Sequence, residues 1–195
     1  MMIGITGSLG SGKTTVAKMF KRLGAYVIDV DELYHSLIKP GKKLYRKIVQ
    51  QFGKGILKEN KAIGTKKLAQ VVFRKKSKLK TLNQLTHPEV IKKIKDIIAS
   101  KKGKFIIVDA ALLIESGFYK ELDKLIVMKI KKDTQLNRIR GITKKEALTR
   151  IRMQAPFKEK AALADFIIDN TGSKKETLSQ VKRIWENINY ETLKG

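Results

Sequence analysis

A glycine-rich run near the start of the chain has the residue types and spacing of a phosphate-binding loop. It reads Gly7-Ser8-Leu9-Gly10-Ser11-Gly12-Lys13-Thr14 and matches the P-loop pattern Gly-x-x-x-x-Gly-Lys-Thr. The glycines let successive backbone N–H groups turn towards one anion, and a following helix N-terminus favours negative charge. We predict that Lys13 reaches the β- and γ-phosphates of ATP and that the Thr14 hydroxyl binds Mg²⁺. The predicted ATP-binding residues here are Gly10, Ser11, Gly12, Lys13, Thr14 and Thr15.

Three aspartates follow short apolar runs elsewhere in the chain, where strands of a parallel sheet would end. Asp109 comes after Phe105-Ile106-Ile107-Val108, the position at which P-loop proteins place a carboxylate for Mg²⁺. Asp29 and Asp31 follow the run at 26–28, and ligands gather at the carboxyl ends of parallel strands. One of the two could accept a proton from a substrate hydroxyl while the other positions the metal or its waters. Helix capping ahead of Glu32 is the structural alternative.

The remaining motifs favour a small kinase among the P-loop proteins. A GTPase would carry an Asn-Lys-x-Asp guanine motif, which the sequence lacks, and the Asp-x-x-Gly string at 169–172 lies too late for a switch loop. A short chain with helical insertions is typical of nucleoside and nucleotide kinases, whose mobile parts close over the substrate.

The elements that must position these residues alternate between strand and helix. Such alternation predicts an α/β fold with a parallel sheet and helices on both faces. The predicted strands are 2–6, 26–29, 105–109, 125–128 and 166–168. The predicted helices are 12–23, 88–99 and 175–193, with helical patches at 44–52, 66–73 and 78–85 and a Lys/Arg-rich helical stretch at 133–164.

Composition limits the classes of function. The 195 residues include no cysteine, which excludes disulfides and thiol chemistry and favours an intracellular, cytoplasmic protein. No apolar run is long enough for a membrane span, and the first predicted strand leaves no room for a signal peptide. The net charge of +25 favours polyphosphate ligands. It also leaves an ATP-dependent nucleic-acid-binding protein as the alternative class, although the lysines are spread along the chain and we expect no specific nucleic-acid partner.

Taken in order, the motifs resemble those of the dephospho-coenzyme A kinase family. The matching segments are 5–17, 24–31, His87-Pro88, 109–117, 135–138, 150–154, 164–165 and 168–173. The Asp-x-Asp at 29–31, the Leu-Leu-x-Glu at 112–115 and the late Asp-Asn-x-Gly are together more specific than the P-loop alone. The chain departs from the family at Ala111, where proline is usual, and is about two residues shorter between Arg138 and Thr143.

The resemblance implies a P-loop kinase fold and transfer of the ATP γ-phosphoryl to the ribose 3′-hydroxyl of dephospho-CoA. Another small nucleoside or nucleotide kinase is the enzymatic alternative. The implied core comprises 1–34, 101–130 and 161–195, with a helical substrate lobe at about 35–100 and a lid at about 131–160. The implied partners are ATP, Mg²⁺ and dephospho-CoA, for a monomer or small homo-oligomer.

Further side chains complete the predicted site. Arginines brought in by a closing lid would stabilise charge on the moving phosphoryl group. The expected catalytic residues are Lys13, Asp31, Arg138 and Arg140, with Arg150 and Arg152 as further phosphate-binding candidates. Substrate contacts are expected from Asp29, Asp31, His87, Leu113 and Glu115, metal contacts from Thr14 and Asp109, and adenine contacts from Asn170 and Gly172. Two alternatives stay open: His87 could simply fix a helix that starts at Pro88, and Glu115 could pair with a lid arginine.

Overall fold

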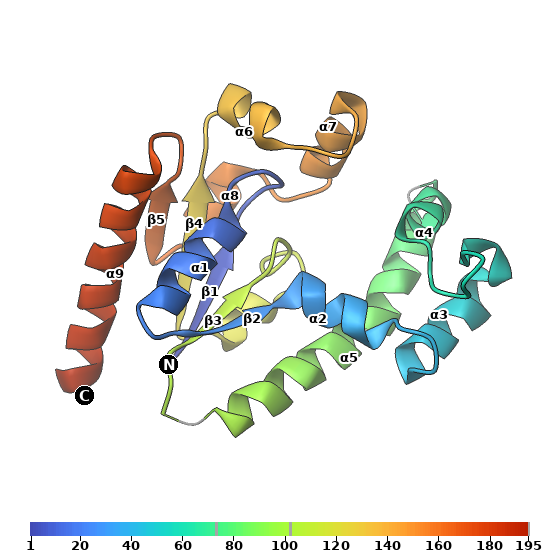
Figure 1. Cartoon of the computed structure of the whole chain (residues 1–195), viewed down its shortest axis with the longest axis horizontal. Coiled ribbons are helices and arrows are strands. Elements are labelled where there is room, and N and C mark those ends of the chain that lie inside the picture. The colour runs from blue at the N-terminus through green and yellow to red at the C-terminus, as the bar shows by residue number, and fades with distance from the viewer. Residues whose placement is uncertain (73, 102, 195) are drawn as a thin grey trace. The chain divides into compact units, whose positions relative to one another are not determined.

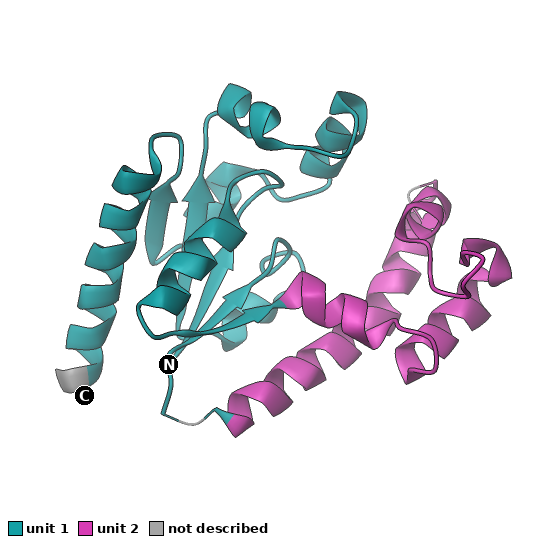
Figure 2. Cartoon of the chain, in the orientation of Figure 1, with its two compact units in different colours: residues 1–29, 101–195 teal, residues 30–100 magenta. Residues whose placement is uncertain are grey.

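The structure, a computed structural model, describes residues 1–72, 74–101 and 103–194. The chain forms two compact units, each described here by itself (Figure 2). Unit 1 comprises Met1–Asp29 and Lys101–Gly195, and unit 2 comprises Val30–Ser100. Unit 2 is therefore a continuous segment inserted between two stretches of unit 1.

Unit 1 is built on a five-stranded parallel sheet in the order β2-β3-β1-β4-β5 (Figure 1). The strands are β1 (Met2–Thr6), β2 (Tyr26–Asp29), β3 (Ile106–Asp109), β4 (Lys124–Lys129) and β5 (Phe166–Asp169). The predicted α/β fold and the predicted strands are confirmed, with shifts of one residue at some ends. Because every strand runs the same way, the chain leaves all of them at one edge, and that edge carries the P-loop.

The two faces of the sheet are covered by different elements. α1 (Lys13–Arg22) and α9 (Lys174–Lys194) pack together on one face. There Ile3 and Ile5 of β1, both fully buried, join Phe20 and Ile188 in one apolar cluster. Alternate residues of a strand face opposite ways, and Gly4 lies beneath the side chains of Leu113 and Leu122 instead.

The segment between β4 and β5 forms three short helices. They are α6 (Lys132–Arg138), α7 (Lys144–Arg152) and α8 (Phe157–Ala161). Thr143 and Glu146 form a reciprocal capping box that fixes the start of α7. α8 packs against β4. The helical character predicted for 133–164 is confirmed, whereas the function of this segment as a lid stays a prediction.

Unit 2 is helical and has its own apolar core. Its elements are α2 (Val30–Leu37), α3 (Lys43–Phe52), the 3-10 helix η1 (Lys54–Ile56), α4 (Thr65–Val72) and α5 (Lys76–Ser100). The core includes Ile38, Leu44, Ile48, Ile56 and Leu68, each at most 5% exposed. Phe73, the last residue of the helical patch predicted at 66–73, lies outside the described residues.

The prediction that a helix starts at Pro88 is wrong. α5 runs continuously through Pro88 and joins the segments predicted separately at 78–85 and 88–99. Proline removes one backbone donor and crowds the preceding turn, which usually ends or kinks a helix. Here the buried residues Thr86, Val90 and Ile94 lie on both sides of Pro88, so their burial stabilises the helix across the proline.

Within the described ranges, no helix combines the length and apolar character needed to cross a membrane.

Candidate active site

The P-loop joins β1 directly to α1. Thr6 ends the strand and Lys13 begins the helix. Gly10 and Gly12 have φ angles of +78° and +88°, in the left-handed region that favours glycine. A β-carbon on Gly12 would also lie 2.0 Å from the Nδ2 atom of Asn170. Conformation and close packing therefore both require glycine at position 12.

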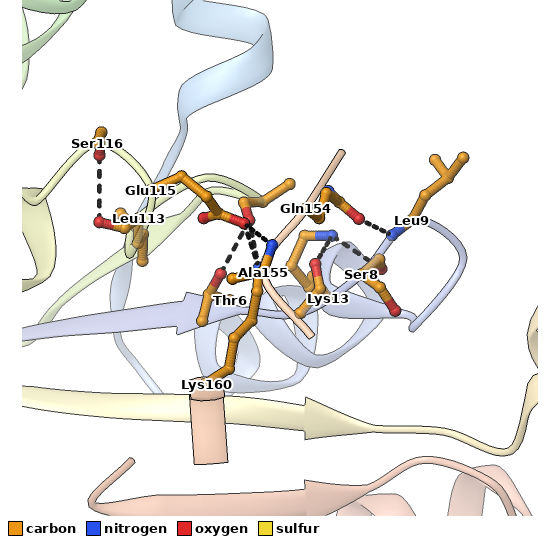
Figure 3. Close-up of polar contacts among 12 residues, drawn as sticks. Thr6, Ser8, Leu9, Lys13, Leu113, Glu115, Ser116, Gln154, Ala155 and Lys160 are labelled. Carbon is orange, nitrogen blue, oxygen red and sulfur yellow. Dashed lines mark hydrogen bonds and ion pairs between the residues drawn. The ribbon is translucent and has the colours of Figure 1, made fainter. Parts of the chain in front are cut away.

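The Lys13 side chain folds back over the loop. Its Nζ atom donates hydrogen bonds to the carbonyl oxygens of Gly7 at 3.1 Å and Ser8 at 3.5 Å (Figure 3). Thr14 and Thr15, in the first turn of α1, are exposed. The ammonium group and the N-terminus of a ten-residue helix thus lie at the same loop, an arrangement that favours binding of a polyphosphate.

Asn170 fastens the end of β5 to the P-loop. Its Nδ2 donates to the Ser11 carbonyl at 2.8 Å, and its Oδ1 accepts the Thr177 hydroxyl at 2.8 Å. The Asn170 side chain is thus occupied in supporting the loop. Gly172 is exposed just before α9, where Ser173 and Glu176 cap the helix. Contacts of Asn170 and Gly172 with adenine stay a prediction.

Two glutamines that the sequence reasoning did not assign a role hold the tip of the P-loop. Gln135 of α6, only 6% exposed, donates from Nε2 to the Ser8 hydroxyl and to the Leu9 carbonyl. Gln154, after α7, accepts the Leu9 N–H at 2.9 Å (Figure 3). Both lie in segments that carry the family resemblance, but an uncharged side chain far away in sequence gives no chemical signal of such a role.

The two predicted catalytic arginines, Arg138 at the end of α6 and Arg140 just after it, differ in their anchoring. Arg138 donates from Nη1 to the Asn170 carbonyl at 2.8 Å, which places its guanidinium beside the support of the P-loop. Arg140 donates only to nearby backbone in the hydrogen bonds described, to the carbonyls of Asn137 and Ile139. The structure therefore brings Arg138, but not Arg140, into the polar network of the P-loop.

Asp109 ends β3 beside β1. In the sheet register it pairs with Ile5 of β1 and with Asp29 of β2. Asp109 is 5% exposed and Asp29 is partly buried. Thr6, Asp29 and Asp109 thus end three adjacent strands at the edge that carries the P-loop.

The loop after Asp109 buries one predicted substrate residue and pairs another. Leu113 is 2% exposed and lies over Gly4, which favours a packing role over direct contact with the substrate. Glu115 forms an ion pair of 2.9 Å with Lys160. A lid arginine was one of two alternatives for Glu115, whose partner is instead a lysine from α8, which the sequence reasoning overlooked.

Unit 2 holds the other predicted substrate residues. Asp31 lies exposed in the first turn of α2, where the helix dipole stabilises a carboxylate. His87 lies inside α5, and partial burial lowers its pKa below the usual 6.5. Its imidazole is consequently neutral at pH 7 and can both donate and accept a hydrogen bond.

Asp169 carries the clearest perturbation of acidity at this edge. The Thr171 side chain is the largest influence lowering its pKa to about 2, with the Thr171 N–H and Lys129 adding to it. The Thr171 N–H donates to Oδ1 at 2.9 Å, and Lys129 lies 3.0 Å from Oδ2. These contacts favour the ionised form of Asp169 in the turn next to Asn170.

Comparison with known proteins agrees with the family resemblance found in the sequence. The family model for dephospho-CoA kinase matches residues 1–176. A dephospho-CoA kinase of Aquifex aeolicus is 43% identical over 189 residues, which cover 95% of this chain and 96% of that protein. A solved structure of the Campylobacter jejuni dephospho-CoA kinase superposes with a TM-score of 0.71 at 31% identity, covering 98% of both chains.

A shikimate kinase structure from Aquifex aeolicus matches with a TM-score of 0.55, at 19% identity and full coverage of both chains. This likeness concerns the fold alone and agrees with a P-loop kinase architecture. The family model and the identity over nearly the whole length carry the stronger statement: this chain belongs to the dephospho-CoA kinase family.

Proposed function

We propose that the edge of the sheet around Lys13 carries out the reaction for which the family is named. The γ-phosphoryl group of ATP is transferred to the ribose 3′-hydroxyl of dephospho-CoA, and the products are CoA and ADP. This is the last step of CoA synthesis. The observation that supports the proposal most directly is the P-loop itself, held in shape by Asn170 and followed by a helix that starts at Lys13.

In this proposal the P-loop binds the phosphates of ATP. Backbone N–H groups of residues 10–15 and the N-terminus of α1 surround the β-phosphate. Lys13 exchanges its bonds to the carbonyls of Gly7 and Ser8 for bonds to phosphate oxygens. Because the lysine already lies over the loop, this exchange requires only a local movement of the ammonium group.

The residues present fit a magnesium ion bound together with ATP. Among the described residues, no cluster of three or more His, Cys, Asp or Glu side chains forms a metal cage. Mg²⁺ in kinases uses only one or two protein oxygens, with phosphates and waters supplying the rest. The Thr14 hydroxyl and the Asp109 carboxylate provide oxygens of that kind. The bound ion would neutralise charge that develops on the phosphates.

The acceptor hydroxyl requires a group that takes its proton. We assign this role to Asp31, which is exposed at the start of α2, and assign partly buried Asp29 to positioning. A carboxylate that accepts the proton as the phosphoryl group arrives is the arrangement used by protein kinases. His87 and Glu115 are proposed as substrate contacts. Because Lys160 already pairs with Glu115, Glu115 would meet the substrate as part of an ion pair and not as a free carboxylate.

Arg138 is the arginine that we expect at the phosphates. Its guanidinium already lies next to Asn170, and a charge placed there stabilises the equatorial oxygens of the phosphoryl group in flight. A cytoplasmic location is also proposed, supported by the absence of cysteine from the sequence.

Product analysis tests the reaction. The purified chain is incubated with ATP, Mg²⁺ and dephospho-CoA, and both ADP and CoA are quantified by chromatography and mass spectrometry. We expect equal amounts of the two products and no ADP without the acceptor. Phosphorylation of nucleosides in place of dephospho-CoA would move the protein to another class of small kinase, and ADP formation without any acceptor would contradict a kinase role.

A further inference from the structure

Lys160 is a charged residue inside the protein. The residue is only 1% exposed, although lysines normally keep their ammonium group in water. A buried charge is costly unless it is paired and hydrogen-bonded. The burial of Lys160 therefore requires an ion pair and hydrogen bonds that compensate its charge, and these contacts indicate its role.

Both contacts of the Lys160 ammonium lie in the loop that follows Asp109. The Nζ atom lies 2.9 Å from Glu115 Oε1 and donates to the Ala111 carbonyl at 3.0 Å. The same carbonyl accepts the hydroxyl of Thr6, the last residue before the P-loop, at 3.1 Å. Donors from β1 and α8 thus hold one carbonyl two residues beyond Asp109.

Glu115 extends this link to the segment before α8. Its Oε1 accepts the Ala155 N–H at 2.8 Å, and the neighbouring Gln154 accepts the Leu9 N–H of the P-loop (Figure 3). Residues 154–160 therefore contact both loops from which phosphate and metal ligands are proposed to come. The link connects three segments that are far apart in sequence.

The backbone of Ala111 is the part of the loop that these contacts hold in place. A proline restricts its own backbone without help from neighbouring groups. Ala111 does not impose that restriction, and its carbonyl is instead fixed by two hydrogen bonds from Thr6 and Lys160.

We propose that Lys160 is a positioning residue that, with Glu115, holds the loop after Asp109 at a fixed distance from the P-loop. It touches neither nucleotide nor acceptor; it acts through the backbone of Ala111 and through Glu115. This inference rests on the proposed function, because it assumes that the two loops bind ATP and its metal ion.

The test is a double variant, Lys160→Met with Glu115→Gln. The single variant Lys160→Met would leave a carboxylate without its cation and could lower stability for that reason alone. The double variant removes both charges, keeps similar volumes and leaves an amide oxygen for the Ala155 N–H. Lys158→Met, an exposed lysine on the same helix, is the matched control.

Two measurements report on positioning. Hydrogen exchange of peptides covering 110–117 should be faster in the double variant, while peptides from α9 exchange as in the wild type. The kcat should fall roughly 10- to 100-fold, since misplacement of about 1 Å can cost 10²-fold in rate. The KM for ATP should stay nearly unchanged, because Asn170, Gln135 and Gln154 still hold the P-loop. Lys158→Met should match the wild type in both measurements.

The outcomes separate the inference from the function on which it rests. Wild-type exchange at 110–117 together with an unchanged kcat would overturn the positioning role. A loss of activity that equals the unfolded fraction seen in thermal melts would overturn it too. If the double variant does not fold, Thr6→Val is measured in the same two ways and must show the same pattern at smaller amplitude. This variant removes the second hydrogen bond to the Ala111 carbonyl and keeps the ion pair of Lys160 with Glu115. A wild-type protein that makes no CoA would contradict the proposed function, whereas exchange at 110–117 would still test the link.

Discussion

The P-loop edge of unit 1 and the helical unit 2 are organised in different ways. At the P-loop edge, the side chains of Asn170, Gln135 and Gln154 hold backbone atoms of Leu9 and Ser11 and the hydroxyl of Ser8. Unit 2 is held mainly by an apolar core, and its predicted functional residues, Asp31 and His87, lie outside that core. Phosphate recognition thus depends on a backbone shape fixed by polar contacts, whereas the proposed acceptor contacts are individual side chains on helices.

This contrast indicates how each region should respond to mutation. Changes at the P-loop edge should affect every activity that needs ATP, because the phosphates bind to a shared loop. Changes at Asp31 or His87 should affect the acceptor and leave ATP binding intact. The predictions below test that separation, from the largest expected effect to the smallest.

Lys13→Ala should abolish most of the activity. The ammonium group is lost from the P-loop, so kcat should fall by about 10³-fold or more, because the lysine stabilises charge that develops on the phosphoryl group. Thermal stability should change little, since the partly exposed Lys13 side chain donates hydrogen bonds to the carbonyls of Gly7 and Ser8 and belongs to none of the apolar clusters described. Steady-state ADP formation and a thermal melt provide the measurements, with Lys18→Ala, an exposed lysine of α1, as the control. Unchanged turnover would contradict the assignment of the loop.

Asp31→Asn should reduce kcat by about 10²-fold, the usual contribution of a general base. Binding of an ATP analogue, followed by calorimetry, should remain as in the wild type because Asp31 belongs to unit 2. Asp29→Asn is the matched comparison, and we expect a smaller loss of kcat there. A larger loss in Asp29→Asn than in Asp31→Asn would exchange the two roles, and weak ATP binding in Asp31→Asn would break the separation between the two regions.

The sequence predicted the sheet and the loop well because their determinants are local. Short apolar runs such as Met2-Ile3-Gly4-Ile5-Thr6 predict buried strands, and the spacing of Gly7, Gly12 and Lys13 predicts the phosphate-binding loop. The family resemblance also selected the correct family, since several motifs occur in order along the chain.

What the sequence could not predict depends on contacts between distant segments. The pairing of Lys160 with Glu115 joins α8 to the loop after β3, and nothing local distinguishes Lys160 from the many exposed lysines. The helix start predicted at Pro88 was wrong for a related reason, because burial of Val90 and Ile94 outweighs the local preference of proline. The assignment of Asn170 missed that its side chain supports the P-loop.

Arg138→Met and Arg140→Met should separate two arginines that are close in sequence. Arg138 is anchored at Asn170, and its loss should lower kcat about tenfold, as expected for one charge-assisted hydrogen bond worth about 1.5 kcal/mol. Arg140 bonds to nearby backbone only, in the hydrogen bonds described, and its loss should leave kcat close to the wild-type value. Both variants are compared in the same ADP assay. A larger effect at Arg140 would indicate that lid closure brings this side chain to the phosphates.

Asp169→Asn should give the smallest effect, one on stability that depends on pH. The pKa of Asp169 is lowered from 3.8 to about 2, so ionisation of this carboxyl stabilises the folded state above pH 3.8. That contribution should fade as the pH falls from 3.8 through about 2, where the carboxyl becomes protonated in the folded state as well. Because the side chain is 42% exposed, solvent screening should hold the difference at pH 7 below about 1 kcal/mol. Urea unfolding of wild type and variant at pH 7, 5 and 3 measures it. A difference in unfolding free energy that grows towards pH 3 would show that Thr171 and Lys129 do not stabilise the carboxylate. The turn beside Asn170 would then be held by Gln180, which accepts the Asp169 N–H and donates to the Asp169 carbonyl.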